Sequence, residues 1–91
     1  MLKLAISHAA YKVLADLQAK QYKQVGGAIF RLLKEGHPHD SKALRGARYD
    51  ERRVDCGEYR IVYAIHDDIV EILVIGKHND DEVYRAWLRT T

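Results

Sequence analysis

Residues 52–65 read RRVDCGEYRIVYAI, two segments rich in β-branched and aromatic residues that flank a Gly-Glu pair. Side chains of these types, alternating between apolar and polar, are typical of β-strands. Glycine suits the first position of a type II′ turn, which joins two strands through two residues. We therefore expect a hairpin in which residues 52–56 and 59–65 pair through Gly57 and Glu58.

A two-residue turn also predicts which side chains of the hairpin share a face. Asp55 would lie opposite Arg60, and Arg53 opposite Val62, so that Arg53, Asp55 and Arg60 point the same way. Arg53 and Arg60 would be diagonal neighbours, about 7–8 Å apart. Two guanidinium groups repel unless an anion lies between them, and either the Asp55 carboxylate or a phosphate would fit. A solvated Arg–Asp pair on the protein surface would explain the same residues, and the spacing alone leaves both interpretations open.

The residues before the hairpin predict one strand and two helices. Residues 2–6 are typical of a short strand, and Ser7 is a good helix N-cap. Apolar residues then recur three and four positions apart, as on one side of a helix. The first stripe is Ala10, Val13, Leu14 and Leu17, and the second is Tyr22, Val25, Ile29, Leu32 and Leu33. Gly36 and Pro38 are expected to end the second helix. Within it, Gly26 and Gly27 suggest that another helix packs closely there.

The remaining segments complete an α+β domain. Residues 37–47 are predicted to be a loop, and residues 69–75 a strand that follows an Asp67–Asp68 turn. The acidic residues 80–82 suit the start of a short C-terminal helix, with Val83, Tyr84, Trp87 and Leu88 on its apolar side. The predicted order is βααβββα in a single domain over residues 1–91. An antiparallel sheet would pack against the two N-terminal helices.

Composition narrows the class of protein. The chain has 91 residues, of which 47% are hydrophobic and 31% are charged, values that suit one small globular domain. Its single cysteine, Cys56, excludes an internal disulfide and suits a reducing compartment. No apolar run approaches the roughly 20 residues of a membrane span, and the apolar part of the N-terminus is too short for a secretory signal. We therefore expect a cytoplasmic protein without membrane contact.

Four short segments resemble a known family. They are Leu-Arg-Gly at 44–46, GEYRIVY at 57–63, IGKH at 75–78 and EVYR at 82–85. These segments are similar to the RelE/ParE superfamily of bacterial toxins. The family pattern has a leucine-x-glycine, a G-[DE]-Y-R strand ending in tyrosine, and a glycine followed by basic residues and V-Y. The last two segments favour the RelE, ribonuclease branch over the ParE, gyrase-inhibiting branch.

The resemblance implies a metal-independent endoribonuclease that cleaves mRNA in the ribosomal A site and needs no cofactor. In this reaction a ribose 2′-OH attacks the neighbouring phosphorus and leaves a cyclic phosphate. The chemistry requires a base for the 2′ proton, cations for the charged phosphorane, and an acid for the leaving 5′ oxygen. The His37-x-His39 pair with His66 lacks the further ligands of a closed metal site, so no metal is expected.

Five residues match functional positions of the family. Arg60 matches the strand arginine that stabilises the phosphate, and Arg53 matches a basic position on the preceding strand. His78 occupies a basic position, where a histidine can act as acid or base at cellular pH. Tyr84 matches a tyrosine that stacks on a base or transfers a proton, and Lys77 adds charge beside His78. Each also has a plain structural interpretation, as a surface cation, a solvated histidine or a packing aromatic.

Two acidic residues depart from the family pattern. Glu51 stands where some RelE members have a second lysine, and Asp55 stands where many members have a positive residue. Both replacements would remove positive charge from the cleft. Two further functions therefore stay open: a ParE-like gyrase inhibitor that acts by protein binding, and a non-catalytic member that only binds an antitoxin. In each case the family implies a cognate antitoxin as partner, with the free toxin as a monomer.

Overall fold

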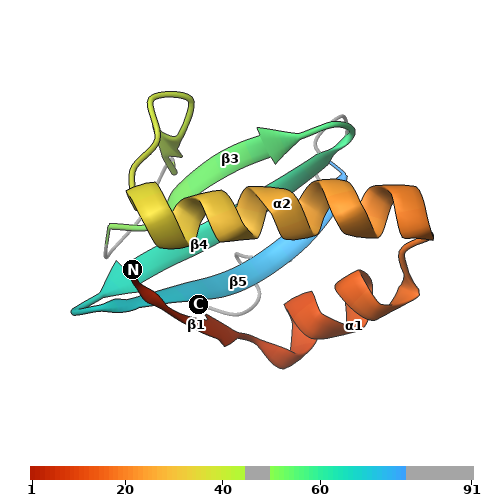
Figure 1. The fold of residues 1–91 in the computed structure, drawn as a ribbon, viewed down its shortest axis with the longest axis horizontal. Helices are drawn as coiled ribbons and strands as arrows, with labels where there is room; N and C mark the ends of the chain where they lie inside the picture. Colours follow the sequence, from red (N-terminus) through yellow and green to blue (C-terminus); the bar gives the residue numbers. More distant parts are fainter. Residues whose placement is uncertain (45–49, 78–91) are drawn as a thin grey trace.

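The computed structural model describes residues 1–44 and 50–77, which form two helices and five strands. Along the chain these elements are β1 (Lys3–Ile6), α1 (His8–Asp16), α2 (Ala19–Glu35), β2 (Lys42–Ala43), β3 (Arg52–Cys56), β4 (Tyr59–His66) and β5 (Ile69–Lys77). The strands make one sheet in the order β1-β5-β4-β3-β2, and both helices lie on the same side of it (Figure 1). The predicted C-terminal helix lies outside the described residues.

The central hairpin has the predicted register. Asp55 lies opposite Arg60 and Arg53 opposite Val62. Gly57 has φ +60°, the left-handed conformation that the first position of a type II′ turn requires. In the next turn Asp67 has φ 56°, a conformation that aspartate tolerates better than most residues. The sequence prediction of three consecutive antiparallel strands is therefore confirmed.

The edge strand β1 makes the sheet mixed rather than wholly antiparallel. It pairs in parallel with β5, with Lys3 opposite Ile69 and Ile6 opposite Ile72. Parallel neighbours need a long connection, and here the two helices and the β2–β4 strands separate β1 from its partner in sequence. The alternation of apolar residues reports strand character but not the partner strand, which is why the parallel pairing was not predicted.

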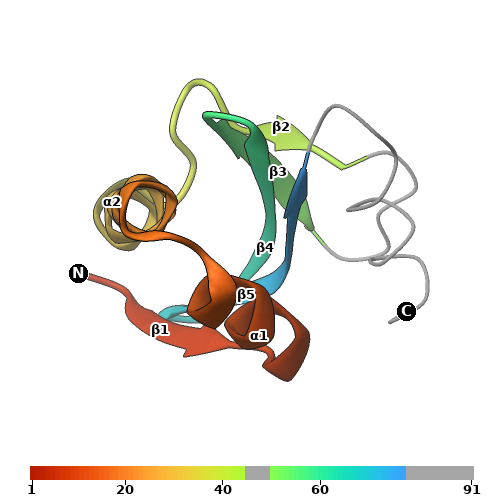
Figure 2. The same ribbon diagram turned by 90° about the vertical axis from the view of Figure 1, so that its right-hand side faces the viewer.

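The helices cover one face of the sheet, as Figure 2 shows from the side. Ser7 caps α1: its Oγ accepts a hydrogen bond from the Ala10 amide at 3.0 Å and donates one to the Leu73 carbonyl at 2.7 Å. One hydroxyl thus satisfies the helix end and ties it to β5. The core between helices and sheet consists mainly of aliphatic residues from both layers: Ala10, Val25, Ile29, Leu32, Leu33, Val54, Ile61, Tyr63, Val70, Ile72 and Ile75.

Two predictions about α2 are wrong in detail. Tyr22 was placed on the buried stripe, but it is 52% exposed. Gly26 and Gly27 were expected to admit a close helix, but a Cβ atom built on either glycine meets nothing within 4 Å. They lie beside an exposed apolar hollow of about 540 Å³, which Tyr22 and Phe30 also line. Helical periodicity places residues around an axis, but it does not say which side meets the rest of the protein.

The predicted loop over residues 37–47 contains a short strand, β2. Lys42 pairs with Arg53, and Ala43 with Arg52. Two residues are too few to show a period, so no sequence pattern marks this strand. Within residues 1–44 and 50–77, no helix has the length and apolar character needed to cross a membrane.

Candidate functional site

Three strands place a basic side chain on the face of the sheet opposite α1 and α2. Val54 of β3 is buried in the helix-side core, so its neighbours Arg53 and Asp55 face the other way. Lys42 of β2 lies opposite Arg53, and Arg60 of β4 lies opposite Asp55. Cross-strand partners share a face, and we call Lys42, Arg53 and Arg60 the cationic strip.

Asp55 forms an ion pair with one member of the cationic strip. Arg60 Nε donates to Asp55 Oδ1 at 2.7 Å, and Arg60 Nη2 lies 3.4 Å from Asp55 Oδ2. The Arg60 side chain is 23% exposed and that of Asp55 is 45% exposed. The sequence left open whether a carboxylate or a phosphate would neutralise the hairpin arginines. In the protein alone, the carboxylate holds Arg60.

A second apolar cluster supports the cationic strip from the same face of the sheet. Val62 lies opposite Arg53 and two residues after Arg60 on β4, and it is fully buried. It packs with Leu44 and Val74, and partly with Leu73. These contacts join β4, β5 and the residue after β2, so the strip stands on packed strands rather than on loops. Sites carried by rigid elements hold their side chains more accurately than sites on loops.

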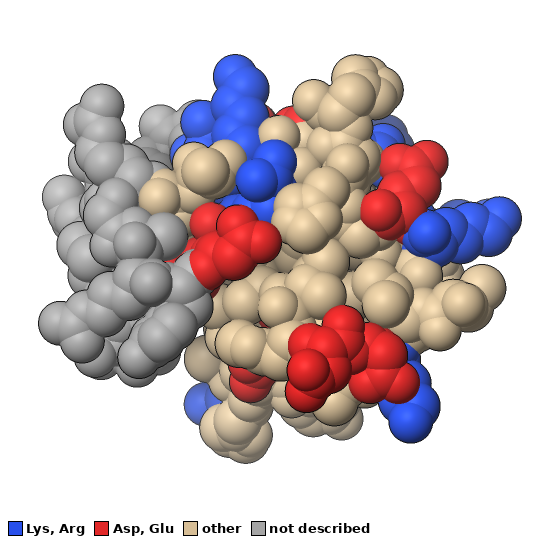
Figure 3. Space-filling model, turned by 90° about the vertical axis from the view of Figure 1, so that its left-hand side faces the viewer, with Lys and Arg blue, Asp and Glu red and all other residues tan. Residues whose placement is uncertain are grey.

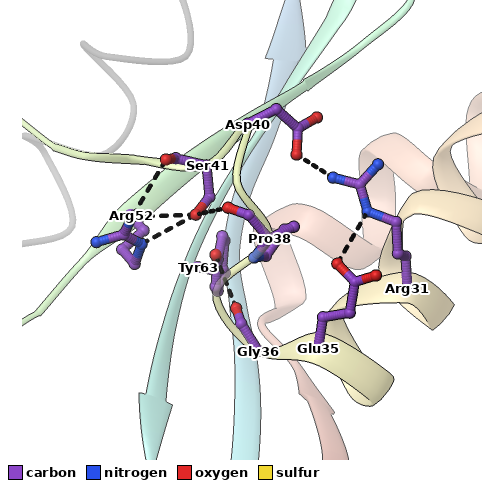
Figure 4. Close-up of polar contacts among 8 residues, drawn as sticks. All are labelled: Arg31, Glu35, Gly36, Pro38, Asp40, Ser41, Arg52 and Tyr63. Carbon is purple, nitrogen blue, oxygen red and sulfur yellow. Dashed lines mark hydrogen bonds and ion pairs between the residues drawn. The ribbon is translucent and has the colours of Figure 1, made fainter.

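A hydrogen-bond network holds the segment before β2 in place (Figure 4). Ser41 Oγ donates to the Pro38 carbonyl at 2.7 Å and accepts from Arg52 Nε at 3.1 Å. Arg52 Nη2 also donates to the Ser41 carbonyl at 3.1 Å. Ser41 is itself buried. These bonds fix the backbone at Lys42, the member of the strip that sequence analysis missed because its strand carries no pattern.

The other predicted site residues are placed differently. Lys77 lies opposite Tyr59, which packs against the helix-side core. The side chain of Lys77 therefore lies on the helix side of the sheet, opposite the cationic strip. Arg60 lies opposite Gly76 instead. His78 and Tyr84 lie outside the described residues. Of the predicted set, the sheet therefore brings together Arg53 and Arg60 and separates Lys77 from them.

The two acidic departures from the family pattern also differ. Asp55 faces the cationic strip, as described above, whereas Glu51 is only 5% exposed. The Glu51 carbonyl accepts a hydrogen bond from the Leu44 amide at 3.0 Å, next to β2. Asp55 therefore forms an ion pair with the strip, and Glu51 is a buried residue whose backbone supports β2.

Charges elsewhere are arranged in mixed pairs. Figure 3 views the end of the molecule where α2 stops, and acidic and basic side chains lie interspersed there over a largely neutral surface. Arg31 pairs with Asp40 and, at 3.9 Å, with Glu35. On the face of the sheet opposite α1 and α2, His66 lies 3.3 Å from Glu71. In the described part of the chain, no three histidine, cysteine or carboxylate side chains gather closely enough to hold a metal ion.

Cys56 has the environment of a structural thiol. Burial raises the pKa of the Cys56 thiol, while the positive charge of Arg31 acts in the opposite direction. Its Sγ lies 3.1 Å from the Gln24 carbonyl, to which it donates. A reactive cysteine needs a lowered pKa, so Cys56 does not have the properties of a nucleophile.

The sequence matches a family model over most of its length. Residues 4–82 match the model described as the ParE toxin of the type II toxin–antitoxin system parDE. No curated protein matches the sequence significantly.

Several solved structures share the fold. The isolated RelE toxin of E. coli superposes with a TM-score of 0.76 at 23% identity, covering 99% of this chain and 98% of that one. The toxin–antitoxin complex RelBE of E. coli gives 0.74 at 23% identity, with 85% and 96% covered. The RelE–RelB complex of Pyrococcus horikoshii gives 0.73 at 24% identity, with 84% and 93% covered. At these identities the likeness shows the fold alone.

Proposed function

Since the chain belongs to the ParE toxin family of type II toxin–antitoxin systems, and is thus a toxin of such a system, we propose that it is a ribosome-dependent mRNA endonuclease. The observation that carries this proposal is the cationic strip. Lys42, Arg53 and Arg60 extend across three neighbouring strands on the face opposite α1 and α2. Such a row of cations is suited to the phosphates of a single RNA strand.

The proposed reaction is attack of a ribose 2′-OH on the adjacent phosphorus, with release of a 5′-OH and formation of a cyclic phosphate. Arg60 would stabilise the negative charge of the phosphorane, and Arg53, its diagonal neighbour, would hold the same or the adjoining phosphate. Lys42 would bind the RNA backbone beyond Arg53. These roles need only charge and hydrogen-bond donors, so no metal takes part in the proposal.

Proton transfer is assigned to residues that the family resemblance supplies. We propose His78 as the acid or base, because an imidazole exchanges protons readily near neutral pH. Tyr84 would stack on a base or assist the proton transfer. Lys77 is the weakest candidate of the set, because the strand register places it on the opposite face of the sheet from Arg60. Its proposed contribution is limited to long-range attraction of the RNA.

A cognate antitoxin is the proposed partner that keeps the toxin inactive in the cytoplasm. In the E. coli and Pyrococcus horikoshii complexes, RelE is bound to RelB. By analogy of fold, we propose that this chain forms a complex with an antitoxin of its own. The apolar surface of α2, where Phe30 is 68% exposed, is free for contact with other proteins.

The direct test is an in vitro translation reaction to which the purified protein is added. Primer extension on the mRNA should reveal new 5′ ends within codons at the ribosomal A site, and the same mRNA without ribosomes should stay intact. The 3′ fragments should carry 5′-hydroxyl ends, and the 5′ fragments cyclic phosphates. Intact mRNA in the presence of active ribosomes would refute the proposal.

A second candidate function is inhibition of DNA gyrase through protein binding. The observation that favours it is the match to the ParE family model, because ParE toxins form the gyrase-inhibiting branch. The two candidates differ in the response of expressing cells. Arrested translation with cleaved mRNA supports the nuclease, whereas a DNA-damage response with uncleaved mRNA supports the gyrase inhibitor. Loss of gyrase supercoiling activity on addition of the pure protein would identify the second function directly.

A further inference from the structure

We infer that Asp55 is a built-in competitor of phosphate at Arg60, so that RNA must displace this carboxylate before it can occupy the cationic strip. The inference deepens the proposed function and rests on it, because it takes Arg60 as a phosphate-binding residue. It assigns to Asp55 a regulatory effect on the anion affinity of the site.

The geometry of the ion pair is the basis of the inference. A guanidinium group binds a carboxylate or a phosphate best through two parallel N–H donors. Arg60 directs Nε to Asp55 Oδ1 at 2.7 Å and Nη2 to Asp55 Oδ2 at 3.4 Å. The carboxylate thus lies on the Nε/Nη2 edge, one of the two edges through which a guanidinium group binds an anion with two donors, and a phosphate cannot occupy that edge at the same time.

The pairing of β3 with β4 keeps the Asp55 carboxylate near the Arg60 guanidinium group even after displacement. Asp55 lies directly opposite Arg60 in the β3–β4 register, two residues before the tight Gly57–Glu58 turn. A displaced Asp55 side chain would therefore remain within a few ångströms of the bound phosphate. Its negative charge would continue to repel that phosphate. Both effects, the lost ion pair and the remaining repulsion, lower the affinity of Arg60 for anions.

The exposure of the pair makes displacement feasible. The Asp55 side chain is 45% exposed, and partly exposed ion pairs are weak enough for a ligand to exchange. A single phosphate gains only Arg60 in return. A strand of RNA gains Arg53 and Lys42 as well, since both lie on the same face of neighbouring strands. An extended polyanion would therefore displace Asp55 more readily than a free phosphate that contacts Arg60 alone.

An alternative role for Asp55 makes the opposite prediction. If the carboxylate only oriented Arg60 for its phosphate, its removal would weaken anion binding. Asp55→Asn tests the two roles, because asparagine keeps the size and one acceptor oxygen but loses the charge. Asp55→Ser serves as a second variant if the first does not fold. Glu58→Gln is the matched control, since it removes one exposed negative charge from the same turn.

The experiment follows the Arg60 Nε–H signal by NMR while inorganic phosphate is added to the purified protein. For Asp55→Asn we expect half-saturation at a phosphate concentration about three- to tenfold lower than for the wild type. Glu58→Gln should stay within about twofold of the wild type. Equal or weaker binding by both Asp55 variants, including no shift of the Arg60 signal in any of the proteins, would overturn the inference.

The outcome is separable from that of the nuclease proposal. Phosphate binding reports on Arg60 and Asp55 without ribosomes, whereas mRNA cleavage needs the whole reaction. If Asp55→Asn binds phosphate more strongly while the wild type leaves mRNA intact, the competitor role of Asp55 stands and the nuclease proposal is rejected. If the wild type cleaves mRNA but the Asp55 variants bind phosphate no more tightly, the nuclease proposal stands and the competitor role is rejected.

Discussion

The Tyr63 hydroxyl in β4 donates a hydrogen bond to the Gly36 carbonyl at the end of α2, with 2.9 Å between the oxygen atoms (Figure 4). Tyr63 is fully buried, and Gly36 has φ +71° as the residue that ends the helix. This bond joins the helix layer to the sheet at the point where the chain turns toward β2. It therefore also supports the segment that carries Lys42.

Tyr63→Phe removes the donor and leaves the buried Gly36 carbonyl without this partner. We expect the free energy of unfolding to fall by about 1–3 kcal/mol, the usual penalty for an unsatisfied buried polar group. Urea denaturation followed by circular dichroism measures the change. Tyr22→Phe, which removes the same hydroxyl at a 52% exposed position, should leave the stability within about 0.5 kcal/mol of the wild type. Equal effects of both changes would contradict the proposed importance of the bond.

Gly27→Ala should stabilise the protein. A glycine inside a helix is less favourable than alanine by about 1 kcal/mol, and a Cβ at Gly27 meets nothing within 4 Å. We expect a gain of about 0.5–1 kcal/mol in the free energy of unfolding. Gly57→Ala is the contrasting change: φ is +60°, and the new Cβ would lie 3.0 Å from Gln24 Oε1. It should lower the free energy of unfolding. If Gly27→Ala lowered it as well, the outer side of α2 would not be open to a Cβ atom.

The hairpin could be predicted from the sequence because local chemistry determines it. The type II′ turn requires a positive φ that Gly57 adopts without strain, a two-residue turn sets the register, and the faces of Arg53 and Arg60 follow from alternation alone. The helix stripe was predicted for the same reason, since Ile29 and Leu32 repeat at helical spacing. In each case the signal lies within a few residues of the structure it specifies.

The features that were missed depend on contacts between distant segments. β2 forms because the hydrogen bonds between Arg52 and Ser41 hold the chain beside β3. The two residues 42–43 carry no pattern that predicts a strand. Lys42 was consequently absent from the predicted site. The parallel pairing of β1 with β5 depends in the same way on how the helices pack. Tyr22 shows the converse, a residue with the right spacing on a side of α2 that no other described element covers.

Cys56 should react slowly with alkylating agents in the folded protein. Because burial raises the pKa of its thiol, the thiolate that attacks iodoacetamide is scarcer than in an ordinary cysteine. We expect the midpoint of the alkylation rate against pH to lie above that of the same protein unfolded in urea. Below the pKa of the unfolded thiol both states keep the proton, so the free energy of unfolding should fall only as the pH rises past that pKa. A midpoint equal to or below the unfolded one would contradict the raised pKa.

Arg60→Gln should lower the rate of mRNA cleavage on the ribosome by about 10²-fold or more, the usual effect of removing a group that stabilises transition-state charge. His78→Ala should have an effect of similar size if His78 transfers a proton. Single-turnover cleavage, followed by primer extension, measures both rates. Lys23→Gln is the control, because it removes one positive charge from an exposed position on α2. Cleavage by Arg60→Gln at the rate of this control would refute the role of Arg60.

Lys42→Gln should weaken RNA binding in a way that depends on salt. Each cation that neutralises a phosphate of a single strand releases a counterion, and contributes about −0.7 to the slope of log K against log salt concentration. Lys42 is exposed and lies opposite Arg53, so its loss should make the slope less steep by about 0.7. Fluorescence anisotropy with a 2′-O-methyl RNA, which lacks the attacking hydroxyl, measures binding without cleavage. Arg53→Gln should give the same reduction, whereas Lys23→Gln on α2 should leave the slope unchanged. If Lys23→Gln reduced the slope as much as Lys42→Gln, the RNA would follow net charge rather than the strip, and Lys42 would lose its place in the site.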